Sequence, residues 1–223
     1  QTSWGVSTRL IGALIMVHGD DRGLVLPPRI APFQAVIVPI LSKKAKDEVL
    51  AAARRLAETL RQAGIRLKLD DREGYSPGWK FNEWEMKGVP LRIELGPRDL
   101  KNEQVVLVRR DNGVKETLSW TELPHRLPLL LEQLQEDLYR RALQYQQEHT
   151  RSGDDYAEFL QVMEQERGFF VASWCGREEC ELKAKEESKA TIRCIPFDRQ
   201  MEHENCLVCG KKAAGVVYFA RAY

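Results

Sequence analysis

Cysteine residues give this sequence its clearest chemistry. Cys206 and Cys209 are separated by two residues, and the following Gly210 permits the sharp backbone turn that presents two sulfurs to one ion. Cys175 and Cys180 form a second, wider pair. Four thiolates carried on two short turns can surround Zn²⁺ tetrahedrally with Zn–S distances of about 2.3 Å. These residues predict a closed zinc site, which is structural because no coordination position is left for a substrate.

The remaining metal-ligating residue types leave alternatives open. Cys194 lies in a strand-like segment, residues 192–196, and is expected to be a buried apolar thiol. His203 is near Cys206 in the sequence and is an alternative ligand. The four thiols could instead be unrelated buried residues or include a redox dithiol, although a redox dithiol would not need the second pair. The odd total of five cysteines excludes a fully paired disulfide framework.

Charge and composition exclude several classes of protein. The 223 residues carry 34 Lys and Arg against 33 Asp and Glu, so any polyanion site must be a local patch. Hydrophobic residues make up 43% and charged residues 30%, which argues against low-complexity or disordered sequence. The longest apolar run, residues 10–17, is far shorter than the ~20 residues that a membrane span needs. With no visible signal peptide and no initiator methionine, we expect a cytoplasmic protein without membrane contact, cut from a longer chain.

Residues 34–120 alternate between strand-like and helix-like patterns. Apolar or alternating runs predict strands at residues 35–40, 65–69, 89–95, 104–109 and 115–120. Helices are predicted at 44–61 and 77–86. Asn112 and Gly113 adopt positive φ at low cost and predict a hairpin between the last two strands. This order predicts an α/β domain with a mixed sheet and helices on its faces.

Further elements are predicted on both sides of this domain. Ser7 or Thr8 can cap an apolar helix that ends near residue 18. This helix should be buried all round, either against the rest of the chain or against sequence upstream of it. Residues 24–26 predict a short strand, residues 121–151 and 154–166 predict helices, and residues 168–174 predict a strand just before the cysteines.

Several motifs together resemble one enzyme family. Residues 1–28, QTSWGVSTRLIGALIMVHGDDRGLVLPP, resemble motif 3 of a class II aminoacyl-tRNA synthetase. The resemblance is closest to prolyl-tRNA synthetases of the archaeal and eukaryotic type, which also occurs in some bacteria. It continues through residues 77–90, residues 94–97, the four cysteines and residues 221–223, and covers essentially the whole chain.

This resemblance implies a domain organisation and an activity. Residues 1–32 would end a class II catalytic domain, residues 33–150 would form an anticodon-binding α/β domain plus connecting helix, and residues 151–223 would form a small α+β zinc-binding domain. The enzyme would activate proline with ATP and Mg²⁺ and transfer it to tRNA(Pro). Motifs 1 and 2 and the proline pocket would lie in the N-terminal half of the same enzyme, so this chain alone should be inactive. Class II enzymes are usually dimers, which implies a homodimer.

The resemblance also implies roles for individual residues. Arg9 matches the motif 3 arginine that packs over adenine and contacts phosphate, and Ser7 matches a neighbouring ATP contact. Trp4 and the terminal Tyr223 match positions near the active site.

Residues 77–115 carry the implied tRNA site. Glu85 and Arg92 match base-reading positions, and Arg98 and Lys115 match further anticodon contacts. The proline anticodons end in two guanines. A guanine offers N–H donors that suit a carboxylate, and its O6 and N7 accept hydrogen bonds from arginine or lysine.

Two other functions remain as alternatives to a ligase. One is a non-catalytic tRNA-binding, zinc-stabilised accessory module. The other is a zinc-ribbon protein that binds a protein partner. A proline pocket and a second arginine motif upstream of Gln1 would favour the ligase over the accessory module, and proline-dependent ATP–pyrophosphate exchange by the intact parent would exclude the zinc-ribbon protein.

Overall fold

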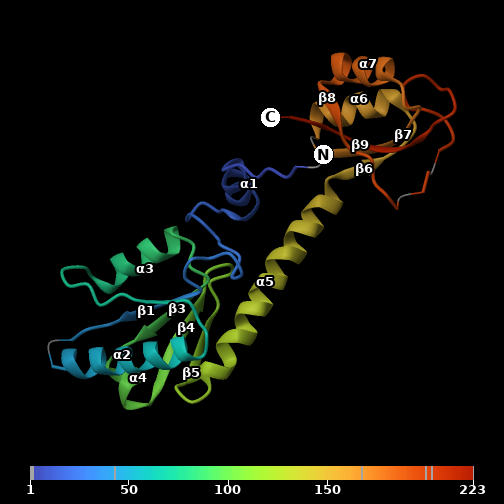
Figure 1. Cartoon of the computed structure of the whole chain (residues 1–223). Helices are drawn as coiled ribbons and strands as arrows, with labels where there is room; N and C mark the ends of the chain where they lie inside the picture. The colour runs from blue at the N-terminus through green and yellow to red at the C-terminus, as the bar shows by residue number, and fades with distance from the viewer. Residues whose placement is uncertain (1–2, 43, 167, 199, 202, 223) are drawn as a thin grey trace. The chain divides into compact units, whose positions relative to one another are not determined.

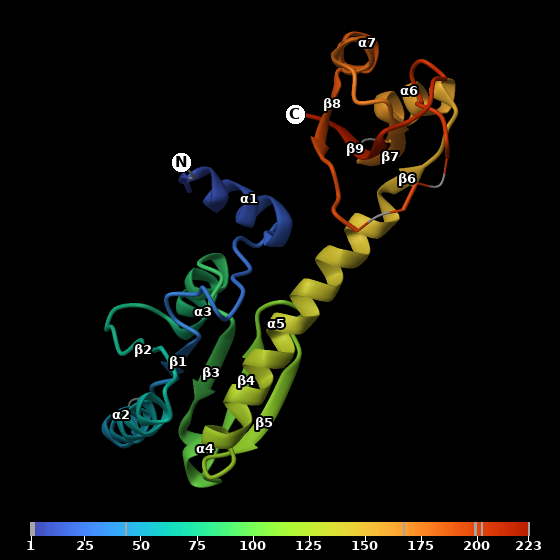
Figure 2. The same cartoon turned by 45° about the vertical axis from the view of Figure 1, so that its right-hand side comes forward.

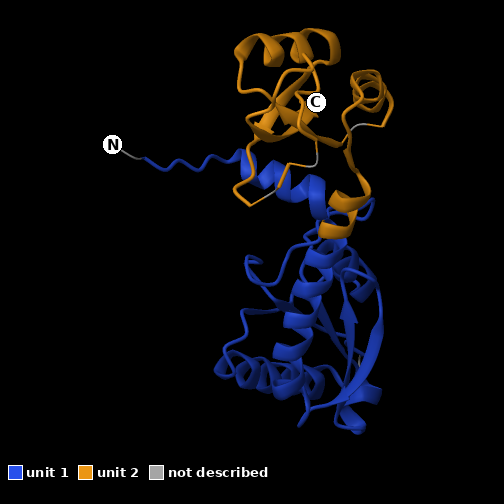
Figure 3. Cartoon of the chain, turned by 90° about the vertical axis from the view of Figure 1, so that its right-hand side faces the viewer, with its two compact units in different colours: residues 1–142 blue, residues 143–223 orange. Residues whose placement is uncertain are grey.

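The computed structural model describes residues 3–42, 44–166, 168–198, 200–201 and 203–222. The chain divides into two units, residues 1–142 and residues 143–223 (Figure 3). Each unit contains its own sheet and its own apolar core.

A five-stranded mixed sheet organises the first unit (Figure 1). In the order β2-β1-β3-β4-β5, β1 is parallel to β2 and β3, whereas β4 and β5 are antiparallel additions. The alternation predicted for residues 34–120 is confirmed, with one short helix, α4, that the sequence pattern did not indicate. The elements are β1 (Ala35–Pro39), α2 (Lys46–Gln62), β2 (Leu67–Leu69), α3 (Pro77–Met86), β3 (Leu91–Leu95), α4 (Pro97–Lys101), β4 (Gln104–Arg109) and β5 (Lys115–Ser119).

Helices cover the two faces of this sheet unequally (Figure 2). On one face, Ile37, Ile93 and Leu107 pack in a single core with α2 and with α5 (Leu123–Glu148). On the other face, Val36 and Val38 pack against Trp84 of α3. Because successive side chains of a strand point to opposite faces, the continuous apolar sequence of β1 reflects burial on both sides.

Helix α1 (Arg9–His18) begins and ends where the sequence predicts, but it is not buried. Its large apolar side chains face solvent, with Leu10 61% and Met16 62% exposed. The expectation that the rest of this chain buries the helix is therefore wrong for the described residues, and burial against upstream sequence stays a prediction. Despite this apolar surface, no helix among the described residues is long and apolar enough to cross a membrane.

The segment after α1 lies against the turn that ends α3. Leu24 N donates to Met86 O at 3.0 Å, and Leu26 N donates to Gly88 O at 3.2 Å. The predicted strand at residues 24–26 is not formed, although alternate amides make strand-like contacts. Gly88 has φ of +72°, and a Cβ there would lie 2.6 Å from Leu24 O, so this close approach requires glycine.

The second unit is built on a four-stranded mixed sheet in the order β6-β7-β9-β8. Phe159, Phe170 and Phe219 form the centre of its core. The predicted helix at 154–166 and strand at 168–174 are confirmed with slightly shorter bounds, whereas the long helix ends at Glu148 and its predicted last residues form β6. The elements are β6 (Thr150–Ser152), α6 (Tyr156–Gln165), β7 (Phe169–Trp174), α7 (Glu178–Ser188), β8 (Ala190–Cys194) and β9 (Gly215–Arg221).

Candidate functional site

Three short segments of the second unit bring four cysteines together. Cys175 directly follows β7, and Cys180 lies in the first turn of α7. Cys206 and Cys209 lie on a tight turn, in which Gly210 N donates to Cys206 O at 2.9 Å and Gly210 has φ of +67°. A hydrogen bond from Leu207 N to Ser173 O, at 2.9 Å, holds this turn against β7.

The sulfur positions fit a tetrahedral metal. All four Sγ atoms lie within 4.8 Å of one another, with Cys175 Sγ 3.5 Å from that of Cys180 and 3.8 Å from that of Cys209. Sulfurs placed tetrahedrally about 2.3 Å from Zn²⁺ would lie about 3.8 Å apart. Cys180 and Cys206 are buried, and four thiols leave no open coordination position. This donor set suits a closed zinc site.

Arg177 lies beside the cysteine cluster. Its Nε donates to Cys175 Sγ at 3.4 Å, and its Nη2 donates to Cys209 Sγ at 3.0 Å. Burial alone would raise the pKa of Cys175, but hydrogen bonds from Arg177 lower it to about 6. The guanidinium therefore stabilises negative charge on Cys175 and Cys209, as a cation next to metal-bound thiolates would.

Two other residues considered from the sequence lie outside the cluster. Cys194, at the end of β8, is exposed, so the expectation of a buried thiol is wrong. The register of β8 against β9 shifts between Ile192 and Cys194, so alternation along the strand does not bury this side chain. His203 Nδ1 lies 3.3 Å from Asp154 Oδ2 and does not belong to the cluster of possible metal ligands.

Helix α3 and strand β3 bring Glu85 and Arg92 to one small hollow of about 20 Å³ in the first unit. Trp84, Val108 and Arg110 contribute to its walls. The Glu85 side chain is 25% exposed and that of Arg92 is 15% exposed. Both side chains are therefore largely buried, but each keeps some surface that solvent or a ligand can reach.

Sheet register places a second predicted residue, Lys115, on the same face of the sheet as Arg92, with β4 between them. Arg92 pairs with Val108 of β4, and Val108 pairs with Lys115 of β5, so the three side chains share one face of the sheet. Lys115 is exposed on the outer strand. Arg98, also exposed, lies in α4 just beyond the end of β3. The four residues assigned to the anticodon thus lie on α3, β3, β5 and the start of α4.

Three residues that the sequence did not single out complete this region. The Arg92 guanidinium lies 4.4 Å from the centroid of the Phe81 ring, and its Nη2 is 2.9 Å from Glu94 Oε1. Arg22 Nη1 lies 2.9 Å from Glu85 Oε1, and Arg110 Nε donates to Glu85 O at 2.8 Å. Phe81 has a sequence signal, because it stands four residues before Glu85 on the same helix face. Arg22 and Arg110 have no such signal in the sequence, because their contacts with Glu85 join residues that are far apart along the chain.

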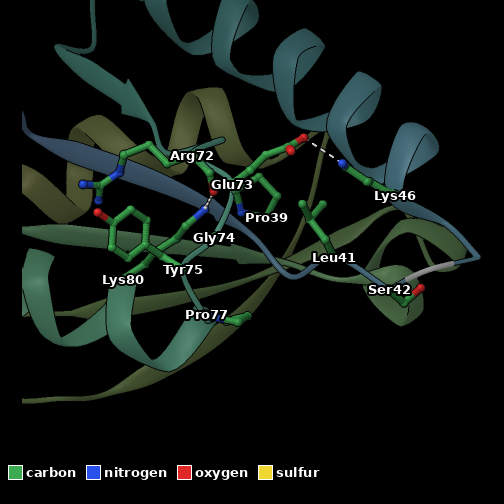
Figure 4. A pocket seen from close by; sticks show the side chains of 10 residues that line it. All are labelled: Pro39, Leu41, Ser42, Lys46, Arg72, Glu73, Gly74, Tyr75, Pro77 and Lys80. Carbon is green, nitrogen blue, oxygen red and sulfur yellow. Dashed lines mark hydrogen bonds and ion pairs between the residues drawn. The ribbon is translucent and has the colours of Figure 1, made fainter.

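A larger hollow, of about 330 Å³, lies where β1 and β2 end and α2 and α3 begin (Figure 4). Its charged groups are already paired: Lys46 Nζ donates to Glu73 Oε1, and Lys80 Nζ donates to Arg72 O, each at 2.7 Å. None of the residues assigned to ATP or to the anticodon lines it.

The residues assigned to ATP lie at the beginning of the chain. Ser7 and Arg9 are exposed, Trp4 is 94% exposed, and none of them lines either hollow. Their role at a nucleotide therefore stays a prediction. Tyr223 lies outside the described residues.

Comparison with known proteins finds two family models that match separate parts of the chain. A family model described as "Anticodon binding domain" matches residues 34–128, which include Glu85, Arg92, Arg98 and Lys115. A second, described as "Prolyl-tRNA synthetase, C-terminal", matches residues 156–223, which include the cysteine cluster. The chain matches the C-terminal portion of prolyl-tRNA synthetases. The resemblance inferred from residues 1–28 and the cysteine spacing is thereby confirmed.

Curated relatives agree over the whole chain. The chain is 50% identical over 225 residues to the proline–tRNA ligase of Natranaerobius thermophilus, which it covers to 46%. It is 51% identical to that of Alkaliphilus oremlandii and 52% identical to that of Oceanobacillus iheyensis, again covering 46% of each. The chain therefore spans about half the length of these relatives.

Proposed function

We propose that this chain recognises the anticodon of tRNA(Pro) as part of a proline–tRNA ligase. The observation that carries the proposal is the placement of Glu85 and Arg92 in one hollow at the protein surface. An anticodon loop is unpaired, so its bases can be splayed out, stacked and read along their edges. A small hollow is sufficient for this purpose, because only the edge of a base has to enter it.

The chemistry of the hollow suits guanine. The Glu85 carboxylate would accept hydrogen bonds from the N1–H and the 2-amino group, both of which guanine presents on its Watson–Crick edge. Arg92 would donate to O6 or N7, the acceptors with which arginine commonly pairs. Phe81 lies under the Arg92 guanidinium and holds it in place through a cation–π contact. Arg98 and Lys115 would supply positive charge to the flanking nucleotides.

We further propose that the four-cysteine cluster holds zinc and stabilises the second unit. Cys175, Cys180, Cys206 and Cys209 would be its ligands, and Arg177 would offset the excess negative charge of four thiolates around a divalent ion. Zinc would cross-link β7, α7 and the turn at residues 206–209. The role is structural, because the site would be closed.

The remaining assignments rest on the family resemblance of the sequence and complete the proposal. Residues 1–32 would end the catalytic domain, residues 33–150 would form the anticodon-binding domain with its connecting helix, and residues 151–223 would form the C-terminal domain. Arg9 and Ser7 would contact ATP, which reacts with Mg²⁺ bound, and Trp4 and Tyr223 would lie near the proline site. The N-terminal half of the enzyme, usually within a cytoplasmic homodimer, would supply the rest of the catalytic machinery.

Anticodon recognition can be tested with small RNA hairpins. The full 223-residue chain should bind a hairpin carrying the proline anticodon at least ~10-fold more tightly than the same hairpin with both guanines replaced by adenine, because each lost base contact costs about 1–3 kcal/mol. Fluorescence anisotropy at fixed ionic strength measures both affinities. Equal affinities for the two hairpins would refute the proposal, since backbone contacts alone do not depend on base identity.

A further inference from the structure

A tight turn two residues beyond α1 lies against the end of α3. Asp20 N donates to Gly23 O and Gly23 N donates to Asp20 O, each at 3.0 Å, which closes the turn. A Cβ on Gly23 would lie 2.6 Å from Met86 O, so the two backbones are in direct contact. This turn is therefore packed against the residue that follows Glu85.

Four residues of this region form a closed ring of hydrogen bonds and ion pairs. The Asp20 carboxylate accepts from Arg110 Nη1 at 2.8 Å, from Arg110 Nη2 at 2.6 Å and from Arg22 N at 2.9 Å. Arg110 then donates through Nε to Glu85 O at 2.8 Å, and Arg22 Nη1 reaches Glu85 Oε1 at 2.9 Å. Both the backbone and the carboxylate of Glu85 are thus held by residues that Asp20 orients.

The two arginines of the ring differ in burial. The Arg110 side chain is 3% exposed, whereas that of Arg22 is 61% exposed. The guanidinium of Arg110 holds the pKa of Asp20 at about 2, so Asp20 is a carboxylate at neutral pH. The buried arginine fixes the backbone, and the exposed arginine contacts the carboxylate at the surface.

The Arg22 contact leaves Glu85 able to bind a base. Arg22 contacts Oε1, and each carboxylate oxygen can accept two hydrogen bonds. Enough lone pairs therefore remain for the two donors on the guanine edge. A Glu side chain that is free to rotate loses conformational entropy when it binds, and a side chain already held in place loses less.

We propose that Asp20 and Arg22 are positioning residues that orient Glu85 and thereby set its selectivity for guanine. This inference rests on the proposed role of Glu85 in reading the anticodon. Its new content is that the turn directly after the motif 3 helix takes part in base discrimination, although it lies outside the matched anticodon-binding region, which begins at residue 34.

Selectivity for one functional group of guanine tests the inference. Inosine differs from guanine by lacking the 2-amino group, so the ratio of affinities for guanine and inosine hairpins reports that contact. We expect Arg22→Ala in the full chain to lower this ratio about three- to tenfold. Arg22→Lys should restore part of it, because an ammonium group also pairs with a carboxylate. Asp20→Asn should also lower the ratio.

A matched control separates positioning from loss of charge. Arg29 lies on the same segment, is 69% exposed and pairs with one carboxylate, that of Glu132, at 3.0 Å. Arg29→Ala removes the same charge and should leave the ratio unchanged. If Arg22→Ala behaves like Arg29→Ala, or raises the ratio, the inference is overturned.

A substitution of Glu85 itself distinguishes this failure from that of the proposed function. Glu85→Gln should lower the ratio whether or not Arg22 contributes, because an amide cannot accept both donors. If Glu85→Gln lowers it and Arg22→Ala does not, only the positioning role fails. If neither variant lowers it, the role of Glu85 in reading guanine fails as well.

Discussion

Replacing Cys206 by serine is expected to abolish zinc binding and to destabilise the second unit. Removing one of four thiolates leaves an incomplete donor set, and structural zinc contributes about 10–16 kcal/mol of binding free energy in small metal-dependent domains. The second unit has only residues 143–223 from which to build a core, and small domains have little stability to spare. We expect its melting temperature to fall by at least ~10 °C, since 1 kcal/mol corresponds to about 4–8 °C at this size.

Metal content and melting temperature should be measured on the same preparations. The wild-type chain should contain one zinc ion per chain, and Cys206→Ser should contain less than about a tenth of that amount. Cys194→Ser is the matched control, because Cys194 is exposed and lies outside the cluster. It should keep both the zinc and the melting temperature.

Chelation separates the effect of metal loss on stability from the effect of removing a buried thiol. Removing zinc from the wild-type chain should lower its melting temperature about as much as the substitution does, and Cys206→Ser should not respond to the chelator. A wild-type protein that is isolated without zinc and melts at the same temperature after chelation would contradict the zinc assignment.

Arg92→Ala is expected to weaken binding of the proline anticodon hairpin by about 1–3 kcal/mol, a loss of roughly 5- to 150-fold in affinity. The arginine lies over Phe81 and lines the same hollow as Glu85. Its planar fork would donate to guanine, so its removal should lower affinity for guanine hairpins more than for adenine hairpins. Titrations of both hairpins at several salt concentrations measure the two effects.

Two further variants separate base recognition from charge. Arg92→Lys keeps the positive charge but loses the bidentate geometry, so it should retain nonspecific affinity and lose base preference. Arg54→Ala removes an exposed arginine of α2 that pairs with Asp71, on an element that covers the other face of the sheet. It should bind like wild type. An Arg92→Ala variant that keeps full discrimination between the hairpins would contradict the assignment.

Local sequence was sufficient to predict the sheet of the first unit. The apolar run of β1 indicates burial on both faces, and the spacing of Val49, Ala53, Leu56 and Leu60 gives α2 one buried stripe. The hairpin between β4 and β5 was predictable because Gly113, with φ of +72°, stands in the turn. These elements depend on contacts between neighbours in the sequence, for which periodicity is informative.

Other elements could not be predicted from hydrophobic periodicity. The buried stripe of α7 consists of Cys180, Ala184 and Ser188, which are spaced by four but are small or weakly apolar. The sequence of this helix therefore resembles that of a charged surface segment. The residues around Cys194 predict a strand with a buried thiol, but the irregular pairing of β8 with β9 leaves Cys194 exposed. Such a register shift depends on contacts between strands and cannot be predicted from the local sequence.

The candidate anticodon site was predictable only in part. Glu85 and Arg92 could be chosen because the surrounding motif resembles a family in which these positions read bases. The residues that hold Glu85 could not be chosen, because Asp20 and Arg110 are 90 positions apart and each looks like an ordinary surface charge in the sequence. Their partnership depends on the folded contact between the turn after α1 and the end of β4.

The most direct test of guanine recognition is a crystal structure of the full chain bound to a hairpin carrying the proline anticodon. We expect one guanine to present its N1–H and 2-amino group to the Glu85 carboxylate at about 2.7–3.2 Å. Arg92 should donate to a guanine acceptor while Arg22 remains within hydrogen-bond distance of Glu85. Guanines bound elsewhere on the chain, with the hollow beside Phe81 empty, would contradict recognition of the anticodon by Glu85 and Arg92.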